Sequence, residues 1–206
     1  MTDALVLYSH PMSRGRIVRW ILEELGVPYR AEILQYGESM KAPEYLRINP
    51  MGKVPALVHE GTVVTECAAI CAYLADTFPE AGLAPAMRER GAYYRWLFFA
   101  AGPLEAAMAD RTLGVEPDSR QQMMVGYGSL GQVLETLEGA LPAQGYIAGD
   151  RFTAADVYLG SHIGWWLEFG HLESRPRFAD YWARVSDREG YRRARALDDA
   201  LMPSAP

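Results

Sequence analysis

The segment Asn49–Ile70 constrains the fold most, because it predicts two paired strands followed at once by a helix. Its residues predict a strand at Ala56–His59, a turn at Glu60-Gly61 and a second strand at Val63–Thr65. Two short strands joined by a tight turn with glycine form a hairpin. A helix that begins at Glu66, directly after the second strand, leaves its first backbone N–H groups without partners inside the helix. Such a helix end suits a carboxylate ligand.

The dipeptide Val54-Pro55 adds a second feature to this segment. Proline has no backbone N–H, so a proline just before a strand removes one donor from the strand ladder. We therefore expect Val54 to keep backbone groups with which another extended peptide could pair. The whole segment predicts a cradle for a small acidic peptide.

Up to about residue 78 the chain alternates between strand and helix patterns in the order β-α-β-α-β-β-α. A strand–helix–strand unit of this size implies that the first two strands are parallel. The sequence therefore predicts a compact domain with a mixed sheet. Besides the hairpin, the expected elements are a strand at Ala4–Tyr8, a helix at Arg14–Leu25, a strand at Tyr29–Ile33, a short helix at Pro43–Ile48 and a helix at Glu66–Phe78.

The segment Pro79–Pro85, rich in proline, glycine and alanine, marks a change of pattern and predicts a domain boundary. We expect domains at residues 1–80 and 87–206, the second of them entirely helical. At Thr153 and Asp156 the spacing predicts a capping box, which makes Asp156 a structural residue. The helices expected are Met87–Arg111 with a bend near Gly102-Pro103, Ser119–Leu141, Thr153–Gly170, Arg177–Val185 and Ser186–Leu201.

Charge and composition exclude several classes of partner. The formal net charge is -6, which argues against nucleic acid or an acidic membrane surface as the main partner. The first residues show no signal-peptide pattern, and the longest apolar stretch, near Trp96–Leu104, is too short to span a bilayer. The two cysteines, Cys67 and Cys71, indicate a reducing cytoplasm and are expected in the core, with no metal bound.

Four features together resemble the cytosolic glutathione transferase superfamily, and the match spans essentially the whole chain. The first is the βαβαββα unit. The other three are the turn Asn49-Pro50-x-Gly52-Lys53-Val54-Pro55-Ala56-Leu57, the helix start Thr65-Glu66-Cys67-x-x-Ile70-x-x-Tyr73-Leu74, and Gly149-Asp150-x-Phe152-Thr153-x-Ala155-Asp156. The resemblance implies a thioredoxin-like α/β domain that binds glutathione as co-substrate. It also implies an all-helical domain that builds most of a pocket for a small hydrophobic electrophile, and a homodimer.

The resemblance implies a role for each residue of the cradle. Pro55 would be the family's cis-proline, and the backbone of Val54 would pair with the cysteinyl part of glutathione. Glu66 and the residue after it would hold the γ-glutamyl end, and Lys53 would reach the carboxylates. Position 67 departs from the pattern, because most members carry serine there. A Cys67 thiol donates more weakly than a hydroxyl, so we expect somewhat reduced affinity.

The resemblance assigns thiol activation to a Tyr, Ser or Cys near the start of the first helix, within Ser9–Arg16 here. A hydroxyl and the helix N-terminus together could lower a thiol pKa by about two units, or about 3 kcal/mol. Ser13 is the first candidate and Ser9 the second, and neither serine is the third alternative. The bacterial class that uses cysteine would have it at position 14, which is Arg14 here. We expect His10 to be a neutral surface imidazole.

The leading hypothesis is a glutathione S-transferase that activates the glutathione thiol for attack on a small hydrophobic electrophile. One alternative is a glutathione-dependent thiol reductase or peroxidase, in which glutathione is itself oxidised. The other is a transferase-fold binding module without catalysis, because one fold hosts many functions.

Overall fold

The computed structural model describes residues 5–173 and 175–202. By their contacts these residues form two compact units: the described residues up to Leu83 with those from Ser186 on, and residues 84–185. The division into domains at 1–80 and 87–206 stays a prediction. The structure adds that the described residues from Ser186 to Met202 pack with the first unit.

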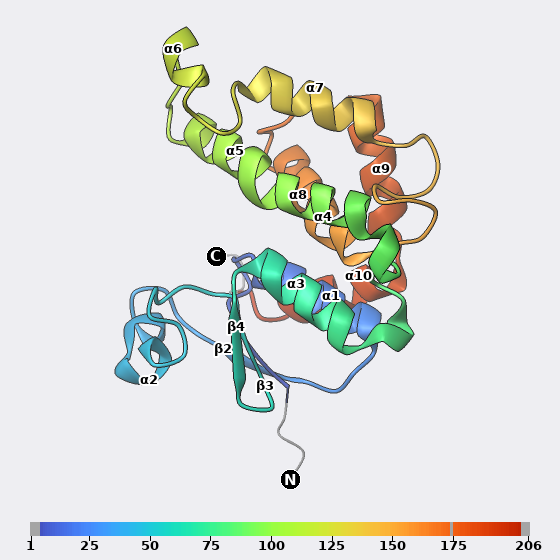
Figure 1. The fold of residues 1–206 in the computed structure, drawn as a ribbon. Helices are drawn as coiled ribbons and strands as arrows, with labels where there is room; N and C mark the ends of the chain where they lie inside the picture. The colour runs from blue at the N-terminus through green and yellow to red at the C-terminus, as the bar shows by residue number, and fades with distance from the viewer. Residues whose placement is uncertain (1–4, 174, 203–206) are drawn as a thin grey trace. The chain divides into compact units, whose positions relative to one another are not determined.

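A four-stranded sheet with the strand order β2-β1-β3-β4 organises the first unit (Figure 1). Strands β1 and β2 are parallel and the other pairs are antiparallel, so the sheet is mixed, as predicted. The first strand lies slightly later than expected, and Ala4 is outside the described residues. The strands are β1 (Val6–Ser9), β2 (Arg30–Ile33), β3 (Ala56–His59) and β4 (Thr62–Thr65).

The predicted hairpin is formed by β3 and β4. Only Glu60 and Gly61 connect the strands, and both have positive φ angles, 49° and 76°. Two-residue turns with positive φ angles match the natural twist of a hairpin, which is why glycine is favoured there. Ala56 and Leu57 at the start of β3 are fully buried.

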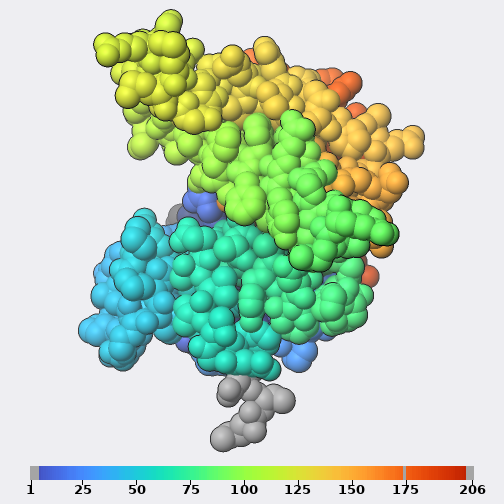
Figure 2. All heavy atoms as spheres, viewed as in Figure 1, coloured from blue at the N-terminus to red at the C-terminus, as the bar shows by residue number. Residues whose placement is uncertain are grey.

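Helices cover both faces of this sheet. Helices α1 (Gly15–Leu25) and α3 (Cys67–Thr77) pack against each other and against the strands on one face. Successive strand residues point to opposite faces. Tyr8 accordingly packs on the other face against Tyr45 of α2 (Pro43–Leu46), with ring centroids 5.5 Å apart. The segment that carries α2 stands at one side of the first unit (Figure 1, Figure 2).

The last helix, α10 (Glu189–Asp199), packs along α1. Arg19 of α1 donates from Nε to Asp198 Oδ1 at 2.8 Å, and both side chains are buried. Arg188 forms a second ion pair with Glu24 at 2.7 Å. These pairs join α1 to α10 and to Arg188, the residue just before it, across 179 and 164 residues of the sequence.

The second unit is helical, as predicted, but the prediction of a single helix at residues 119–141 is wrong. Residues 119–141 form two helices because Ser129 starts a new one, its Oγ accepting from Gln132 N at 3.3 Å, after a turn in which Gly128 has a φ of 68°. The bend expected near Gly102-Pro103 is a π-helical segment, Ala100–Leu104. The helices are α4 (Arg90–Phe99), α5 (Glu105–Thr112), α6 (Ser119–Gln122), α7 (Leu130–Ala140), α8 (Ala154–Glu168) and α9 (Pro176–Ser186).

The predicted cap at the start of α8 is confirmed. Both the backbone N–H and the hydroxyl of Thr153 donate to Asp156 Oδ2, at 2.9 and 3.0 Å. Oδ1 of the same carboxylate accepts from Ile147 N at 2.8 Å and from the Tyr181 hydroxyl at 2.7 Å. Asp156 is fully buried, so water cannot reach its carboxylate. The four protein donors take the place of water.

Within the described ranges, none of the helices combines the length and the apolar character that crossing a bilayer requires.

Candidate functional site

The strand register gathers several predicted site residues at one end of the sheet. Tyr8 of β1 is opposite Ala56 of β3, and Ala56 is opposite Thr65 of β4. In antiparallel pairs the next residues along these strands also lie side by side. Ser9, Pro55 and Glu66 therefore meet at this end of the sheet.

The turn before β3 is held by two side chains that contact the Lys53 carbonyl. Asn49 Nδ2 donates to this oxygen at 2.8 Å, and the Tyr45 hydroxyl donates to it at 2.5 Å. Burial raises the pKa of Tyr45 to about 12, so the hydroxyl keeps the proton that it donates. No role for Asn49 or Tyr45 was predicted from the sequence, although Asn49 opens the turn motif. The Lys53 side chain itself is exposed.

Val54 presents an open stretch of backbone at this turn. The Val54-Pro55 peptide bond is cis, as the resemblance implied. Both strand ladders of β3 begin at Ala56, and neither the N–H nor the C=O of Val54 bonds to any of the described residues. An extended peptide could therefore pair with Val54 without displacing an existing hydrogen bond.

Glu66 joins β4 to α3 in an unusual backbone conformation. Its φ and ψ angles are 66° and 113°, and no side chain caps the helix that follows. A non-glycine residue with such angles costs about 1–3 kcal/mol, and such strain concentrates at ligand sites. The first turn of α3 also contains no acidic residue that would compete with an anionic ligand for the N–H groups.

Cys67 links the start of α3 to the start of α1. Cys67 is buried, and its thiol donates to the carbonyl oxygen of Arg14, with Sγ 3.6 Å from the oxygen. Ser13 directly precedes Arg14, so the two helix ends that were predicted to hold and to activate the ligand lie together. Cys67 and Cys71 are both buried, and they are not joined by a disulfide bond. Over the residues that the structure describes, no group of three or more His, Cys, Asp or Glu could hold a metal ion.

Ser13 is partly exposed and hydrogen bonded on both sides. Its hydroxyl donates to the His10 carbonyl at 2.7 Å, and its Oγ accepts from the Gly15 N–H at 3.0 Å. The serine therefore satisfies an N–H group in the first turn of α1. Its proton can turn toward a ligand only by leaving the His10 carbonyl, while the Gly15 bond remains.

Ser9 is in a different environment. It is fully buried, and its Oγ has no hydrogen-bond partner among the described residues. It faces Gly15 at the start of α1, so tightly that a β-carbon on Gly15 would overlap the hydroxyl. In this conformation a ligand cannot reach Ser9.

His10 is buried and does not lie on the surface as expected. Its Nδ1 accepts from the backbone N–H of Met12 at 3.1 Å. An accepting Nδ1 carries no proton, so the proton of the neutral ring is on Nε2. His10 therefore shapes the loop between β1 and α1.

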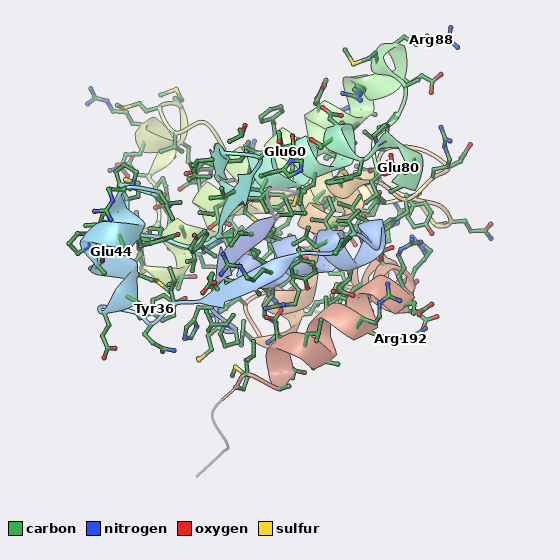
Figure 3. The ribbon with its side chains drawn as sticks, turned by 90° about the horizontal axis from the view of Figure 1, so that it is seen from below. Tyr36, Glu44, Glu60, Glu80, Arg88 and Arg192 are labelled. Carbon is green, nitrogen blue, oxygen red and sulfur yellow. The ribbon has the colours of Figure 1, made fainter. Side chains whose placement is uncertain are left out.

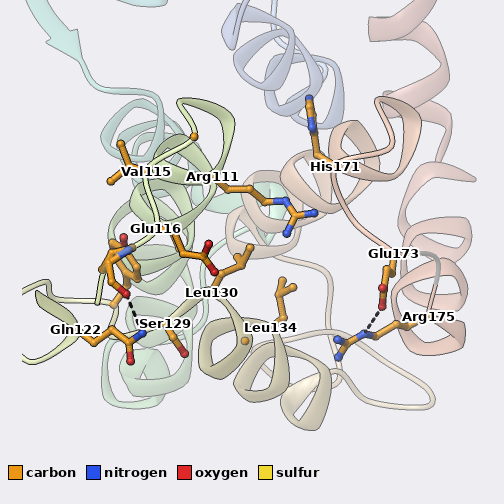
Figure 4. Close-up of a pocket in the computed structure, with 15 residues that line it drawn as sticks. Arg111, Val115, Glu116, Gln122, Ser129, Leu130, Leu134, His171, Glu173 and Arg175 are labelled. Atoms are coloured by element: carbon orange, nitrogen blue, oxygen red, sulfur yellow. Dashed lines mark hydrogen bonds and ion pairs between the residues drawn. The ribbon is translucent and has the colours of Figure 1, made fainter. Parts of the chain in front are cut away.

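The second unit contains a cavity of about 480 Å³ between α5, α7 and the segment after α8 (Figure 4). Its charged lining includes Arg175, which pairs with Glu138 at 2.6 Å and with Glu173 at 3.9 Å. Arg111, Leu130, Leu134 and His171 also line it. None of the predicted site residues does so.

Family comparisons agree with these observations. The chain matches the model "Glutathione S-transferase, N-terminal domain" over residues 12–77 and "Glutathione S-transferase, C-terminal domain" over residues 100–197. It is 30% identical over 168 residues to glutathione S-transferase GST-4.5 of Xanthomonas campestris. The matched region covers 77% of this chain and 81% of the relative.

Solved structures show the same fold. A glutathione transferase from Methylococcus capsulatus superposes with a TM-score of 0.79 at 29% identity, covering 96% of this chain and 100% of that one. A sphingomonad glutathione S-transferase complexed with glutathione superposes with a TM-score of 0.77 at 25% identity, covering 94% of this chain and 98% of that one. The predicted fold class, a thioredoxin-like α/β unit with an all-α unit, is confirmed.

Proposed function

Because the chain belongs to the glutathione S-transferase superfamily, we propose that it binds glutathione and adds the thiol to a small hydrophobic electrophile. The backbone of Val54 would pair with the cysteinyl part of glutathione. The strained Glu66 and the N–H of Cys67 would hold the γ-glutamyl end, and Lys53 would attract the carboxylates. These groups fit a small peptide acid, because they combine open backbone, a helix end and one exposed cation.

The observation that carries this proposal is the contact between Cys67 Sγ and the Arg14 carbonyl. It brings the start of α3, where the peptide would be held, beside the start of α1, where Ser13 lies. A peptide anchored at one helix end can then present its thiol to the other.

Ser13 would lower the pKa of the bound thiol. The Gly15 N–H polarises the Ser13 hydroxyl, and a donor whose oxygen also accepts a hydrogen bond is the stronger donor. The thiol would release its proton to water, and the Ser13 hydroxyl would donate to the resulting thiolate. The sulfur lone pair then forms a bond to the electrophilic carbon, and any leaving group departs with the electron pair of its own bond.

A pair of serine variants tests the assignment. In Ser13→Ala we expect kcat with a chlorinated nitroaromatic electrophile to fall by about two orders of magnitude, as for loss of one positioned donor. Glutathione affinity, measured by calorimetric titration, should change little. Ser9→Ala is the matched control and should keep its activity, because Ser9 is buried beneath α1. Equal activity in Ser13→Ala and the wild type would contradict the assignment.

Binding itself is the first test of the proposed function. No heat of binding with glutathione would contradict both the transferase and the reductase and would favour a non-catalytic binding module. Disulfide reduction without conjugation would instead favour the reductase. The proposal also includes a homodimer in the cytoplasm, and light scattering of the purified chain tests the dimer.

A further inference from the structure

The loop between β1 and α1 is held at Met12 from two sides. The Met12 N–H donates to Nδ1 of His10 at 3.1 Å, and the Met12 carbonyl accepts from the Tyr36 hydroxyl at 3.0 Å. Both backbone polar groups of one exposed residue are thus fixed by side chains. The Met12 side chain, 63% exposed, contributes little packing of its own.

The two side chains that hold Met12 also contact each other. The rings of His10 and Tyr36 lie with centroids 4.5 Å apart and planes tilted by 56°. His10 is buried at the end of β1, whereas Tyr36 comes from the loop after β2 and lies at the outer edge of the first unit (Figure 3). Tyr36 is 55% exposed, and the partial loss of water around its hydroxyl raises its pKa, with Arg14 opposing the rise, so the hydroxyl keeps the donated proton.

Ser13 follows Met12 directly and depends on the same loop. The His10 carbonyl accepts from both the N–H of Ser13, at 3.1 Å, and its hydroxyl, at 2.7 Å. Movement of Met12 would therefore move the backbone that sets the position of the Ser13 Oγ. Misplacing a catalytic donor by about 1 Å can cost a hundredfold in rate.

We infer that His10 and Tyr36 are positioning residues that hold Met12 and thereby fix the position of the Ser13 Oγ, whose proton turns from the His10 carbonyl to the bound thiol. The inference rests on the proposed function, since it takes Ser13 as the donor. It adds that Tyr36, distant in sequence from every predicted site residue, takes part in thiol activation. Neither side chain is assigned a contact with the ligand.

Two substitutions at His10 separate its two contacts. His10→Phe keeps a ring against Tyr36 but removes the acceptor for Met12. His10→Asn removes the ring but keeps an acceptor, because asparagine side chains accept from the backbone two residues later. We expect His10→Asn to stay near wild type and His10→Phe to behave like Tyr36→Phe, which removes only the hydroxyl.

The decisive measurement is the pKa of the glutathione thiol bound at saturation, from the ultraviolet absorbance of the thiolate as pH rises. In Tyr36→Phe and His10→Phe we expect this pKa to rise by about one unit and kcat to fall about tenfold. The fall in kcat is smaller than that expected for Ser13→Ala, because the donor is misplaced but still present. The KM for glutathione should change less than threefold, because the cradle around Val54 is untouched.

Tyr73→Phe is the matched control. It also removes a tyrosine hydroxyl that contacts a histidine, with Tyr73 Oη 3.0 Å from His59 Nδ1, but in the C-terminal half of α3. It should leave the pKa of the bound thiol unchanged. Suppose that Ser13→Ala raises the thiol pKa but that Tyr36→Phe and His10→Phe both keep the wild-type thiol pKa and kcat. This result would overturn the inference and leave the assignment of Ser13 intact. An unchanged thiol pKa in Ser13→Ala would instead overturn the assignment of Ser13 and this inference with it.

Discussion

Gly15 of α1 packs directly on Ser9 of β1. A β-carbon at position 15 would overlap the Ser9 Oγ, would lie 2.9 Å from the Ser9 β-carbon and would lie 3.0 Å from the Ser13 Oγ. The absence of a side chain at Gly15 therefore lets the helix start approach the strand end. This approach encloses Ser9 and leaves the Gly15 N–H aimed at Ser13.

Gly15→Ala should displace the start of α1. We expect a loss of about 1–3 kcal/mol in the free energy of unfolding, as for overpacking of a close contact, measured by urea denaturation. Combining it with Ser9→Ala removes the overlapping hydroxyl. The double variant should therefore lose less than the sum of the two single losses. Strictly additive losses would show that the two residues do not contact each other in solution.

Cys67→Ser should tighten glutathione binding. A hydroxyl at position 67 would donate to the γ-glutamyl carboxylate, and not to the Arg14 carbonyl as the thiol does. It donates more strongly than a thiol, and a typical hydrogen bond contributes about 0.5–1.5 kcal/mol, or roughly twofold to tenfold in Kd. Cys67→Ala should keep nearly the wild-type Kd, because the backbone N–H of residue 67 remains. Calorimetric titration with glutathione measures all three proteins. Weaker binding in Cys67→Ser than in Cys67→Ala would contradict the expectation.

Arg19→Met should strongly destabilise the first unit. It leaves the buried carboxylate of Asp198 without its ion-pair partner, which typically costs about 3–5 kcal/mol. The double variant Arg19→Met/Asp198→Leu removes both charges and should lose much less. Chemical denaturation compares the variants, and a double variant as unstable as Arg19→Met would contradict this account.

The pH dependence of Arg19→Met follows from the direction of one pKa. Burial raises the pKa of Asp198, and Arg19 opposes this rise, so the substitution raises the pKa further. Between the ordinary aspartate value of about 3.9 and the raised value, the folded state binds a proton that the unfolded state lacks. Stability therefore falls as pH rises through this window. The deficit of Arg19→Met should be largest near neutral pH and shrink on acidification, and a deficit that grows with acid would contradict it.

Asp156→Asn should destabilise the helical unit although it changes few atoms. It places an amide NH₂ group among the four donors from Ile147, Thr153 and Tyr181. We expect a loss of about 3 kcal/mol or more, because buried donors lose their acceptor. Tyr181→Phe removes one of the four donors and should cost about 1–2 kcal/mol. Thermal unfolding of both variants tests this order of effects.

Features decided by short-range interactions could be predicted from the sequence. The β3–β4 hairpin and the Thr153–Asp156 cap lie within a few residues of where they were expected, because turn, cap and periodicity signals act over one or two helical turns. The prediction failed at residues 119–141, where Ser129 starts a second helix. There the glycines and the capping serine outweighed the periodic pattern.

Sequence patterns predicted most of the elements and their order, the family resemblance and the two candidate serines. The packing of α1 on the sheet distinguishes these serines, because it buries Ser9 under Gly15 and leaves Ser13 partly exposed. The folded chain also places Cys67 on the Arg14 carbonyl, Tyr36 on Met12 and α10 on α1. The physical reason is common to all four. Each contact joins segments whose distance depends on how helices dock on the sheet, and no local preference for helix, strand or turn encodes that docking.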